Sequence, residues 1–162
     1  MRILGIDPGL RVTGLGIIDG DAHAPRHVWH GVVRIPARLP TQERLARIRE
    51  AVRAAAQEWR VEEAAMEASF VGRNARSALA LGQARGAALL GLADAGIPLR
   101  EYSPAEVKQL VAGYGAGGKE QIARMVALQL QLGAVPGPAD AADALAVAIA
   151  HWARRRVERL PE

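Results

Sequence analysis

The sequence predicts an α/β fold in which a mixed five-stranded sheet is flanked by helices. Two observations predict it. Three short strand-like segments separated by turn residues come first, and strands then alternate with amphipathic helices along the rest of the chain. The 162 residues contain no internal repeat and no low-complexity tract. We therefore expect one domain over residues 1–162, because this length suits a single hydrophobic core.

The first three strands are predicted from apolar runs bounded by turn residues. Asp7-Pro8-Gly9 and Asp19-Gly20-Asp21 supply the turns between them. Consecutive short strands with tight turns predict an antiparallel meander of three strands. The strands are expected at Arg2–Asp7, Gly14–Asp19 and His27–Ile35.

Two helices and a strand are predicted in the middle of the chain. Apolar residues at spacings of three and four predict a helix over Thr41–Trp59. Ala64–Glu67 is a short apolar run of the kind that is buried on both faces of a sheet. A second helix is expected over Arg76–Ala95, where Gly96 and Pro98 end it.

The sequence of the C-terminal half of the chain predicts one more strand and three helices. The strand is expected at Pro98–Tyr102. Ser103-Pro104-Ala105-Glu106 is a capping box with proline in the first turn, so a helix starts there and ends at Gly113. Another helix is expected over Gly118–Leu132, and the last begins near Ala139 or Asp140.

Two glycines four residues apart interrupt the second predicted helix. Gly82 and Gly86 each cost about 1 kcal/mol of helix stability relative to alanine. Their use is the close approach of another helix along this bare stripe. That helix belongs either to the same chain or to a second copy in a dimer, and the sequence leaves both readings open.

Composition and charge narrow the class of protein. The chain lacks cysteine, which excludes disulfides and thiolate metal sites. Neither a signal-peptide pattern nor an apolar run of the ~20 residues that span a membrane is present, so we expect a cytoplasmic protein. The formal net charge of +4 and the pI near 10.3 favour an anionic partner.

Four acidic residues lie where the local sequence does not favour them. Asp7 ends the first apolar strand and Glu67 ends the fourth. Asp140 and Asp143 lie three residues apart at the start of the last helix, so they project from one face. If the four meet, each close pair repels by roughly 4 kcal/mol at 4 Å and an effective dielectric of 20. Such a cluster must hold protons or bind hard cations such as Mg²⁺ or Mn²⁺.

Each of these acids also has a simpler interpretation when it is taken alone. Asp7 precedes Pro-Gly and suits a turn, whereas Asp140 and Asp143 suit a helix N-terminus. Neither a turn nor a cap explains Glu67, a glutamate that ends an apolar strand. The combination of two strand ends and a helix start is therefore more specific than any member, and it favours metal-assisted phosphate chemistry.

A glycine-rich segment imitates a nucleotide-binding loop. Gly113–Lys119 fits the spacing G-x-x-x-x-G-K, but Glu120 replaces the usual Ser or Thr and a helix precedes the loop. We therefore interpret the segment as a loop that carries Lys119 towards a phosphate, with Lys108 nearby. The alternative is a solvated surface lysine.

Phe70 follows Glu67 in a stretch that also contains Arg73 and Arg76. An aromatic side chain there either fills the local core or stacks on an unpaired base, which is worth roughly 1–3 kcal/mol per base. The basic residues favour contact with an anionic partner.

Taken together, these segments closely resemble the RuvC family of bacterial Holliday-junction resolvases. The Leu-Gly-Gln-Ala-Arg-Gly and Asp-Ala-Ala-Asp-Ala-Leu runs are specific, whereas the opening motif also resembles that of actin-like ATPases. The resemblance reaches from the first strand to the last helix. The matching residues are Ile3–Gly9, Glu67, Phe70, Asn74, Ser77–Gly86, Val107–Gln109 and Asp140–Ala146.

The resemblance implies a ribonuclease-H-like fold, a homodimer and cleavage of four-way DNA junctions in recombination and repair. It also implies two Mg²⁺ ions per active site, with Mn²⁺ an alternative, and a branch-migration complex as a further partner. Asp7, Glu67, Asp140 and Asp143 match the metal-binding carboxylates, and Lys119 matches a catalytic lysine. The predicted DNA contacts are Phe70, Arg73, Asn74, Arg76 and Lys108.

Three other functions stay open on the sequence alone. A ribonuclease-H-like module could hold branched DNA without cleaving it, although all four acids are present. An actin-like ATPase shares the first strand and turn, but that fold needs two such domains. An enzyme acting on RNA–DNA hybrids is the third, and offering hybrid and junction side by side separates it from a resolvase.

Overall fold

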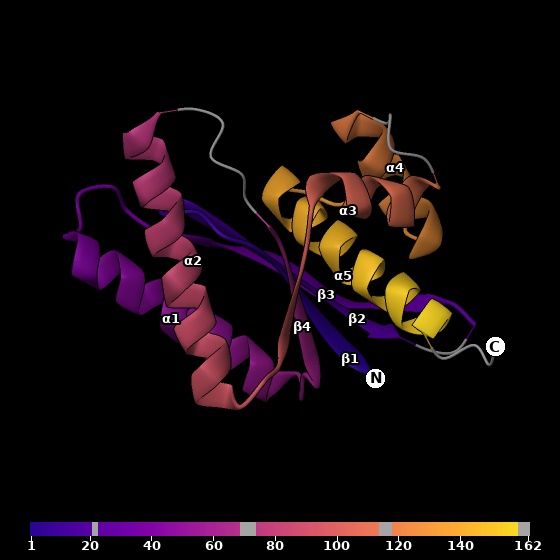
Figure 1. Ribbon diagram of the computed structural model, residues 1–162, viewed down its shortest axis with the longest axis horizontal. Coiled ribbons are helices and arrows are strands. Elements are labelled where there is room, and N and C mark those ends of the chain that lie inside the picture. Colours follow the sequence, from indigo (N-terminus) through magenta and orange to yellow (C-terminus); the bar gives the residue numbers. More distant parts are fainter. Residues whose placement is uncertain (21–22, 69–73, 114–117, 159–162) are drawn as a thin grey trace.

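The structure is a computed structural model that describes residues 1–20, 23–68, 74–113 and 118–158. Its centre is one five-stranded sheet with the strand order β3-β2-β1-β4-β5 (Figure 1). The strands are β1 (Arg2–Asp7), β2 (Val12–Gly20), β3 (Pro25–Arg34), β4 (Glu63–Glu67) and β5 (Leu99–Tyr102). The described residues also form five helices, α1 (Thr41–Glu58), α2 (Ala75–Ala95), α3 (Pro104–Ala112), α4 (Lys119–Gln129) and α5 (Ala139–Glu158).

The sheet is mixed, as predicted. β1, β2 and β3 pair antiparallel, which confirms the meander. β4 pairs parallel to β1 and to β5, because α1 and α2 return the chain to the same edge before each of these strands. Ala64, Ala65 and Met66 are fully buried, as expected for a strand that is covered on both faces.

The helices cover the two faces of the sheet separately. α1 and α2 lie on one face, whereas α3, α4 and α5 lie on the other (Figure 1). Successive side chains of a strand point to opposite faces of the sheet, so a strand can contribute residues to both cores. In β1, Leu4 and Ile6 point towards α1 and α2, whereas Ile3 packs in the core around α5.

Three glycines let α5 lie directly on the sheet. A Cβ atom at Gly5 would lie 1.8 Å from the Ala144 carbonyl oxygen, and one at Gly14 would lie 2.0 Å from the Asp140 carbonyl oxygen. A Cβ at Gly16 would meet Leu145 at 2.8 Å. No side chain fits at these positions, so they set how closely the helix approaches.

A different glycine from those predicted brings the helices of the other face together. A Cβ at Gly91 would lie 2.5 Å from the Arg49 carbonyl oxygen, so α1 and α2 meet there. Within the described part of the chain, nothing lies within 4 Å of a Cβ at Gly82 or Gly86. The interpretation of this pair as an intramolecular contact is therefore wrong.

The helix ends follow the local sequence signals closely. The Ser103–Glu106 capping box is formed in both directions, and Gly96 and Gly113 end their helices in the left-handed region. α4 is shorter than expected: it ends at Gln129 because Leu130 caps it and Gln131 takes a φ of 53°. In the described ranges, no helix is long and apolar enough to cross a membrane.

Candidate active site

Strand register places two of the predicted carboxylates side by side. β1 and β4 are parallel neighbours with Ile6 opposite Met66, so Asp7 and Glu67 come next on the two strands, at the same edge of the sheet. Both side chains lie on the side of the sheet that α5 covers. Asp7 is on the same face of β1 as Ile3, and Glu67 is on the same face of β4 as Ala65, and both of these residues pack in the core around α5.

Because α5 packs closely on the sheet, the other two carboxylates lie at the same edge. Asp7 pairs with Gly14 across β1 and β2, and Gly14 lies against the backbone of Asp140. Asp143 follows on the same face of the helix. The first turn of α5 is thereby held over the end of β1, so a helix start and two strand ends meet.

One cavity of about 360 Å³ collects these groups. It lies between the end of β1, the end of β4, α3, α4 and the first turn of α5. The charged residues that line it are Asp7, Glu67, Asp140, Asp143, Lys108 and Lys119.

The electrostatics of this cavity are those of crowded carboxylates. Burial, followed by the charges of Asp143, Asp140 and Glu67, raises the pKa of Asp7 to about 7. Burial and then Asp143 also raise the pKa of Glu67. Lys119 opposes both shifts, so the lysine compensates only part of the negative charge.

The two lysines differ in how they meet the acids. Lys119 begins α4, and its Nζ lies 3.4 Å from Oδ2 of Asp143, although the lysine side chain is 89% exposed. Lys108 lines the cavity from α3, and its charge offsets part of the rise in the pKa of Glu67. An exposed ion pair of this kind is weak and leaves Lys119 available to another anion.

The carboxylates fit a hard divalent cation by their chemistry. They offer only oxygen ligands, and the pKa of Asp7 is raised by burial and then by the neighbouring acids, both of which a bound cation would offset. Among the described residues, no three His, Cys, Asp or Glu side chains stand close enough to enclose an ion as they are placed. A cation would therefore have to draw the carboxylates inwards.

The predicted DNA contacts fall in different places. Asn74 caps α2 by accepting a hydrogen bond from the Ser77 backbone N–H at 2.9 Å, which gives it a structural task. Arg76 is exposed and lines a second cavity, and Asp140 lines this cavity as well as the first. Phe70 and Arg73 lie outside the described residues.

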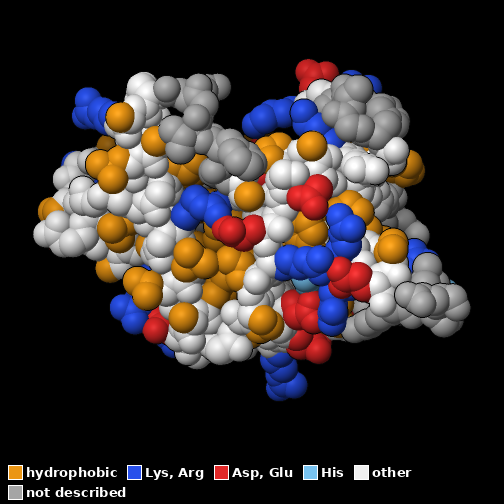
Figure 2. All heavy atoms as spheres, viewed as in Figure 1, with side chains coloured by type: hydrophobic (Ala, Val, Ile, Leu, Met, Phe, Trp, Pro, Cys, Tyr) orange, Lys and Arg blue, Asp and Glu red, His pale blue; other side chains and the backbone are white. Residues whose placement is uncertain are grey.

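Other basic residues have structural partners that the sequence did not reveal. Arg85 donates to the Glu67 backbone carbonyl at 2.6 Å and pairs with Glu101, so it fixes the end of β4. In the C-terminal helix, Arg154 pairs with Glu106 at 3.4 Å and Arg155 with Glu63 at 2.9 Å. Figure 2 shows this mixture of acidic and basic side chains over α3 and α5.

Comparison with known proteins places the chain in a family. The family model described as "Crossover junction endodeoxyribonuclease RuvC" matches residues 3–151. The RuvC of Chloroflexus aggregans is 50% identical over 151 residues, covering 93% of this chain and 92% of the relative. That of Burkholderia thailandensis is 51% identical over 152 residues, covering 93% and 83%.

Solved structures agree with this assignment. Thermus thermophilus RuvC superimposes with a TM-score of 0.91 at 36% identity, covering 98% of this chain and 97% of that one. T. thermophilus RuvC in complex with a Holliday junction substrate gives 0.89 at 35% identity, covering 97% and 96%. The yeast mitochondrial Holliday junction resolvase Ydc2 gives 0.68 at 13% identity, which shows the shared ribonuclease-H-like fold alone. This chain belongs to the RuvC family of crossover junction endodeoxyribonucleases.

Proposed function

We propose that this crossover junction endodeoxyribonuclease cleaves four-way DNA junctions with Asp7, Glu67, Asp140 and Asp143 as its catalytic carboxylates. The observation that carries the proposal is their meeting in one cavity, where burial, followed by the charges of the other three acids, raises the pKa of Asp7 to about 7. A structural cluster of acids would instead be neutralised by arginines. Here the neighbouring Arg85 bonds the backbone carbonyl of Glu67 and leaves its carboxylate in the cavity.

Asp7, Glu67, Asp140 and Asp143 would hold two divalent cations, with Mg²⁺ or Mn²⁺ suited to their oxygen ligands. When bound, such ions supply a nucleophilic hydroxide and neutralise charge on the leaving oxygen. The carboxylates themselves would orient the scissile phosphate by holding the cations that neutralise its charge. Asp7 must be deprotonated to hold a cation. In-line attack that breaks the P–O3′ bond, with the 3′ oxygen as the leaving group, would leave a 5′-phosphate and a 3′-hydroxyl.

Lys119 is proposed to act on the phosphate. Its ammonium group lies at the mouth of the cavity, bound only weakly to Asp143. It can therefore turn towards the extra negative charge that develops on the phosphate oxygens in the transition state. Lys108 lines the same cavity from α3 and supplies a second positive charge.

A homodimer completes the proposed function. An exposed stripe runs along α2 on the side away from the sheet, and its members are Leu79, Gly82, Gly86, Leu90 and Ala93. Leu79 is 65% exposed and Leu90 is 54% exposed, and Figure 2 shows apolar side chains gathered over α2. A two-fold dimer through this stripe would pair two active sites on opposed strands of a junction.

The resemblance also implies a branch-migration complex as a partner of this dimer. Co-purification of the dimer with the motor proteins of such a complex, on junction DNA, tests that part of the proposal. A dimer bound to the junction without the motor would limit the partners to DNA.

One experiment tests the central proposal. Purified protein with Mg²⁺ is offered a mobile four-way junction, a plain duplex and an RNA–DNA hybrid. We expect paired nicks in the junction only, and Asp7→Asn should abolish them while junction binding in a chelator is unchanged. Binding without cleavage by the unmodified protein would favour a non-cleaving module, and preferred cleavage of the hybrid would favour a ribonuclease.

A further inference from the structure

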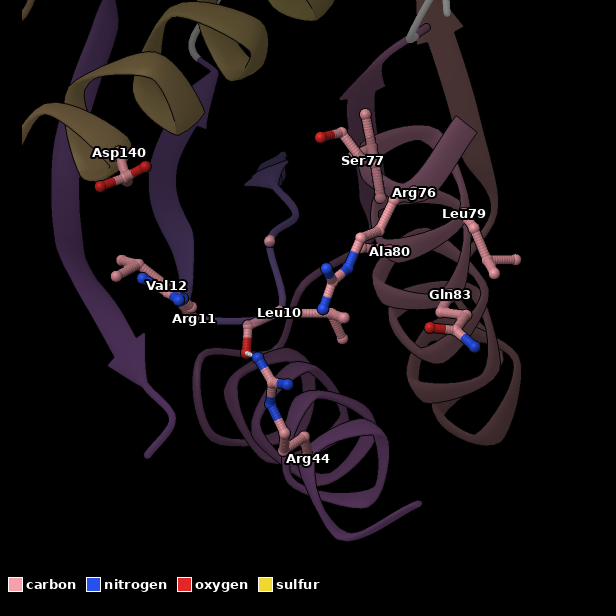
Figure 3. Close-up of a pocket in the computed structure, with 12 residues that line it drawn as sticks. Leu10, Arg11, Val12, Arg44, Arg76, Ser77, Leu79, Ala80, Gln83 and Asp140 are labelled. Atoms are coloured by element: carbon pink, nitrogen blue, oxygen red, sulfur yellow. Dashed lines mark hydrogen bonds between the residues drawn. The ribbon is translucent and has the colours of Figure 1, made fainter. Parts of the chain in front are cut away.

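A second cavity, of about 670 Å³, adjoins the carboxylates. It lies between the turn that joins β1 to β2, the first turn of α1 and the N-terminal half of α2 (Figure 3). Asp140 lines this cavity as well as the one that holds Asp7, so the two cavities meet at the first turn of α5.

The second cavity is basic. Arg11, Arg44 and Arg76 line it from three separate segments of the chain. In the described ranges, none of the three forms an ion pair with a carboxylate. Arg44 donates from Nη2 to the Leu10 backbone carbonyl at 3.0 Å, which anchors its guanidinium against the turn. Figure 3 shows Arg44 reaching from α1 and Arg76 from α2 towards Leu10.

Part of the hydrogen-bonding capacity of these arginines is unused. Nε of Arg44 is buried without a hydrogen-bond partner in the part of the chain that the structure describes, so the other nitrogens of this guanidinium would have to meet a ligand. Arg11 and Arg76 are exposed at the cavity rim. Three guanidinium groups that form no ion pair in the described ranges line one hollow, and they favour an anion with several acceptor oxygens, such as a phosphate.

The surroundings of the arginines fit a nucleotide better than a free ion. Apolar side chains from different sides of the cavity, Leu10, Val12 and Leu79, line it as well. A deoxyribose or base can contact one of them while its phosphate meets the arginines. Lys108 and Lys119 lie in the other cavity, beyond Asp140, so cations flank the carboxylates on both sides.

We propose that the Arg11–Arg44–Arg76 cavity binds one phosphate of the DNA strand next to the phosphate that is cut. This inference rests on the proposed function and deepens it, because it assigns the path of the strand across the active site. Arg11 and Arg44 are thereby DNA-positioning residues. Their task is to hold the strand on the side opposite the two lysines, so that the scissile phosphate lies over Asp7.

The first test measures how junction affinity depends on salt, in a chelator so that no cleavage occurs. Each lost phosphate contact should reduce the slope of log K against log salt by about 0.7–0.9. Because both side chains meet the same phosphate, we expect a reduction of at most this size for Arg11→Gln and likewise for Arg44→Gln. Arg47→Gln is the matched control: Arg47 is exposed on α1, one turn from Arg44, and does not line either cavity. Equal slopes for Arg11→Gln and Arg47→Gln would overturn the proposal.

The second test locates the phosphate. Junctions carrying a single neutral methylphosphonate at successive positions around the cut are bound by the unmodified protein and by Arg11→Gln. At one position beside the cut, the neutral group should weaken binding by the unmodified protein several-fold and weaken binding by Arg11→Gln clearly less. Equal losses for both proteins at every position would contradict the assignment of the cavity.

The tests also separate this inference from the proposed function and from the dimer. If the junction is bound but never cut, the proposal of catalytic carboxylates fails. The salt slopes still show whether the arginine cavity binds a DNA phosphate. Leu79 belongs both to this cavity and to the exposed stripe of α2, so a partner subunit could fill the hollow instead. Sedimentation of Arg11→Gln as a monomer, with the salt slope unchanged, would assign the cavity to the dimer interface and overturn the proposal.

Discussion

At the scale of the residue, Asp7 is the carboxylate with the most strongly shifted pKa in the proposed active site. Its carboxylate stands at the end of a buried strand, and burial with three neighbouring acids raises its pKa to about 7. The folded chain therefore binds a proton there between the ordinary value of 3.8 and about 7, where the unfolded chain does not. The free energy of unfolding accordingly falls as the pH rises through this window, unless a cation replaces the proton.

This balance predicts how Mg²⁺ affects thermal stability. Mg²⁺ should raise Tm at pH 8, where Asp7 is ionised, and much less at pH 5, where a proton holds the site. At ten times its Kd, a bound ion stabilises by about 1.4 kcal/mol, or roughly 3–5 °C for a chain of this size. Thermal melts with and without Mg²⁺ at the two pH values measure the effect.

A substitution separates the site from general ion effects. Asp7→Asn should remove most of the Mg²⁺ shift and raise the metal-free Tm at pH 8, because the repulsion is gone. Glu58→Gln, at an exposed position at the end of α1, should leave the Mg²⁺ shift unchanged. A shift that persists in Asp7→Asn would place the cation elsewhere.

Lys119 is predicted to act on the reaction more than on binding. Lys119→Ala should slow single-turnover cleavage by roughly 10²–10³-fold, the usual cost of losing a group that stabilises transition-state charge. Junction affinity in a chelator should change only a few-fold, because the side chain is 89% exposed. Quenched-flow cleavage and a binding titration measure the two effects.

The matched control for Lys119 lies on the same helix. Arg124 is 72% exposed and pairs with Glu120 at 3.4 Å. Arg124→Ala should leave the cleavage rate intact. If Lys119→Ala changes only the salt dependence of binding, then Lys119 is an ordinary phosphate contact.

At the scale of the element, the position of α5 on the sheet determines whether the four acids lie close together. Gly14 touches the backbone of Asp140 and pairs with Asp7, so one glycine couples the helix start to the strand end. The sequence pattern did not single it out, because a glycine in a strand gives no sign of what lies above it.

Gly14→Ala is therefore predicted to separate the acids. The added Cβ would lie 2.0 Å from a backbone oxygen, so α5 must shift. A displacement of about 1 Å at a catalytic group can cost on the order of 100-fold in rate. The stability should fall by about 1–3 kcal/mol, as for other overpacked cores. Cleavage rates and denaturant melts measure both.

Gly133→Ala is the comparison for this change. In the described part of the chain, nothing lies within 4 Å of a Cβ at Gly133. This variant should keep both stability and activity. A Gly14→Ala protein that cleaves at the unmodified rate would show that the acids do not depend on the seat of α5.

At the scale of the whole molecule, the exposed stripe of α2 predicts the oligomeric state. Leu90→Glu would place two like charges near each other across a two-fold seam, which disfavours the dimer. We expect a monomer by sedimentation, with the folded Tm little changed and with paired nicking of junctions lost.

Leu128→Glu provides the control for that experiment. Leu128 is 70% exposed on α4, away from the stripe. This variant should sediment like the unmodified protein. If Leu90→Glu sediments in the same way, then the α2 stripe is not the seam.

Local signals in the sequence determined much of this molecule. β1 spans Arg2–Asp7 as predicted, and the Ser103–Glu106 capping box starts α3, because such signals act within a few residues. The same reasoning selected Asp7, Glu67, Asp140, Asp143, Lys119 and Lys108, which line one cavity. Their catalytic roles stay predictions.

Only the tertiary structure decided the contacts between distant segments. It showed that Gly91 joins α1 to α2, whereas Gly82 and Gly86 stay open. It also gathered Arg11, Arg44 and Arg76 from three segments into one cavity. The physical reason is that a residue's propensity and periodicity are local, whereas its neighbours across the core, its burial and its pKa depend on where the rest of the chain packs.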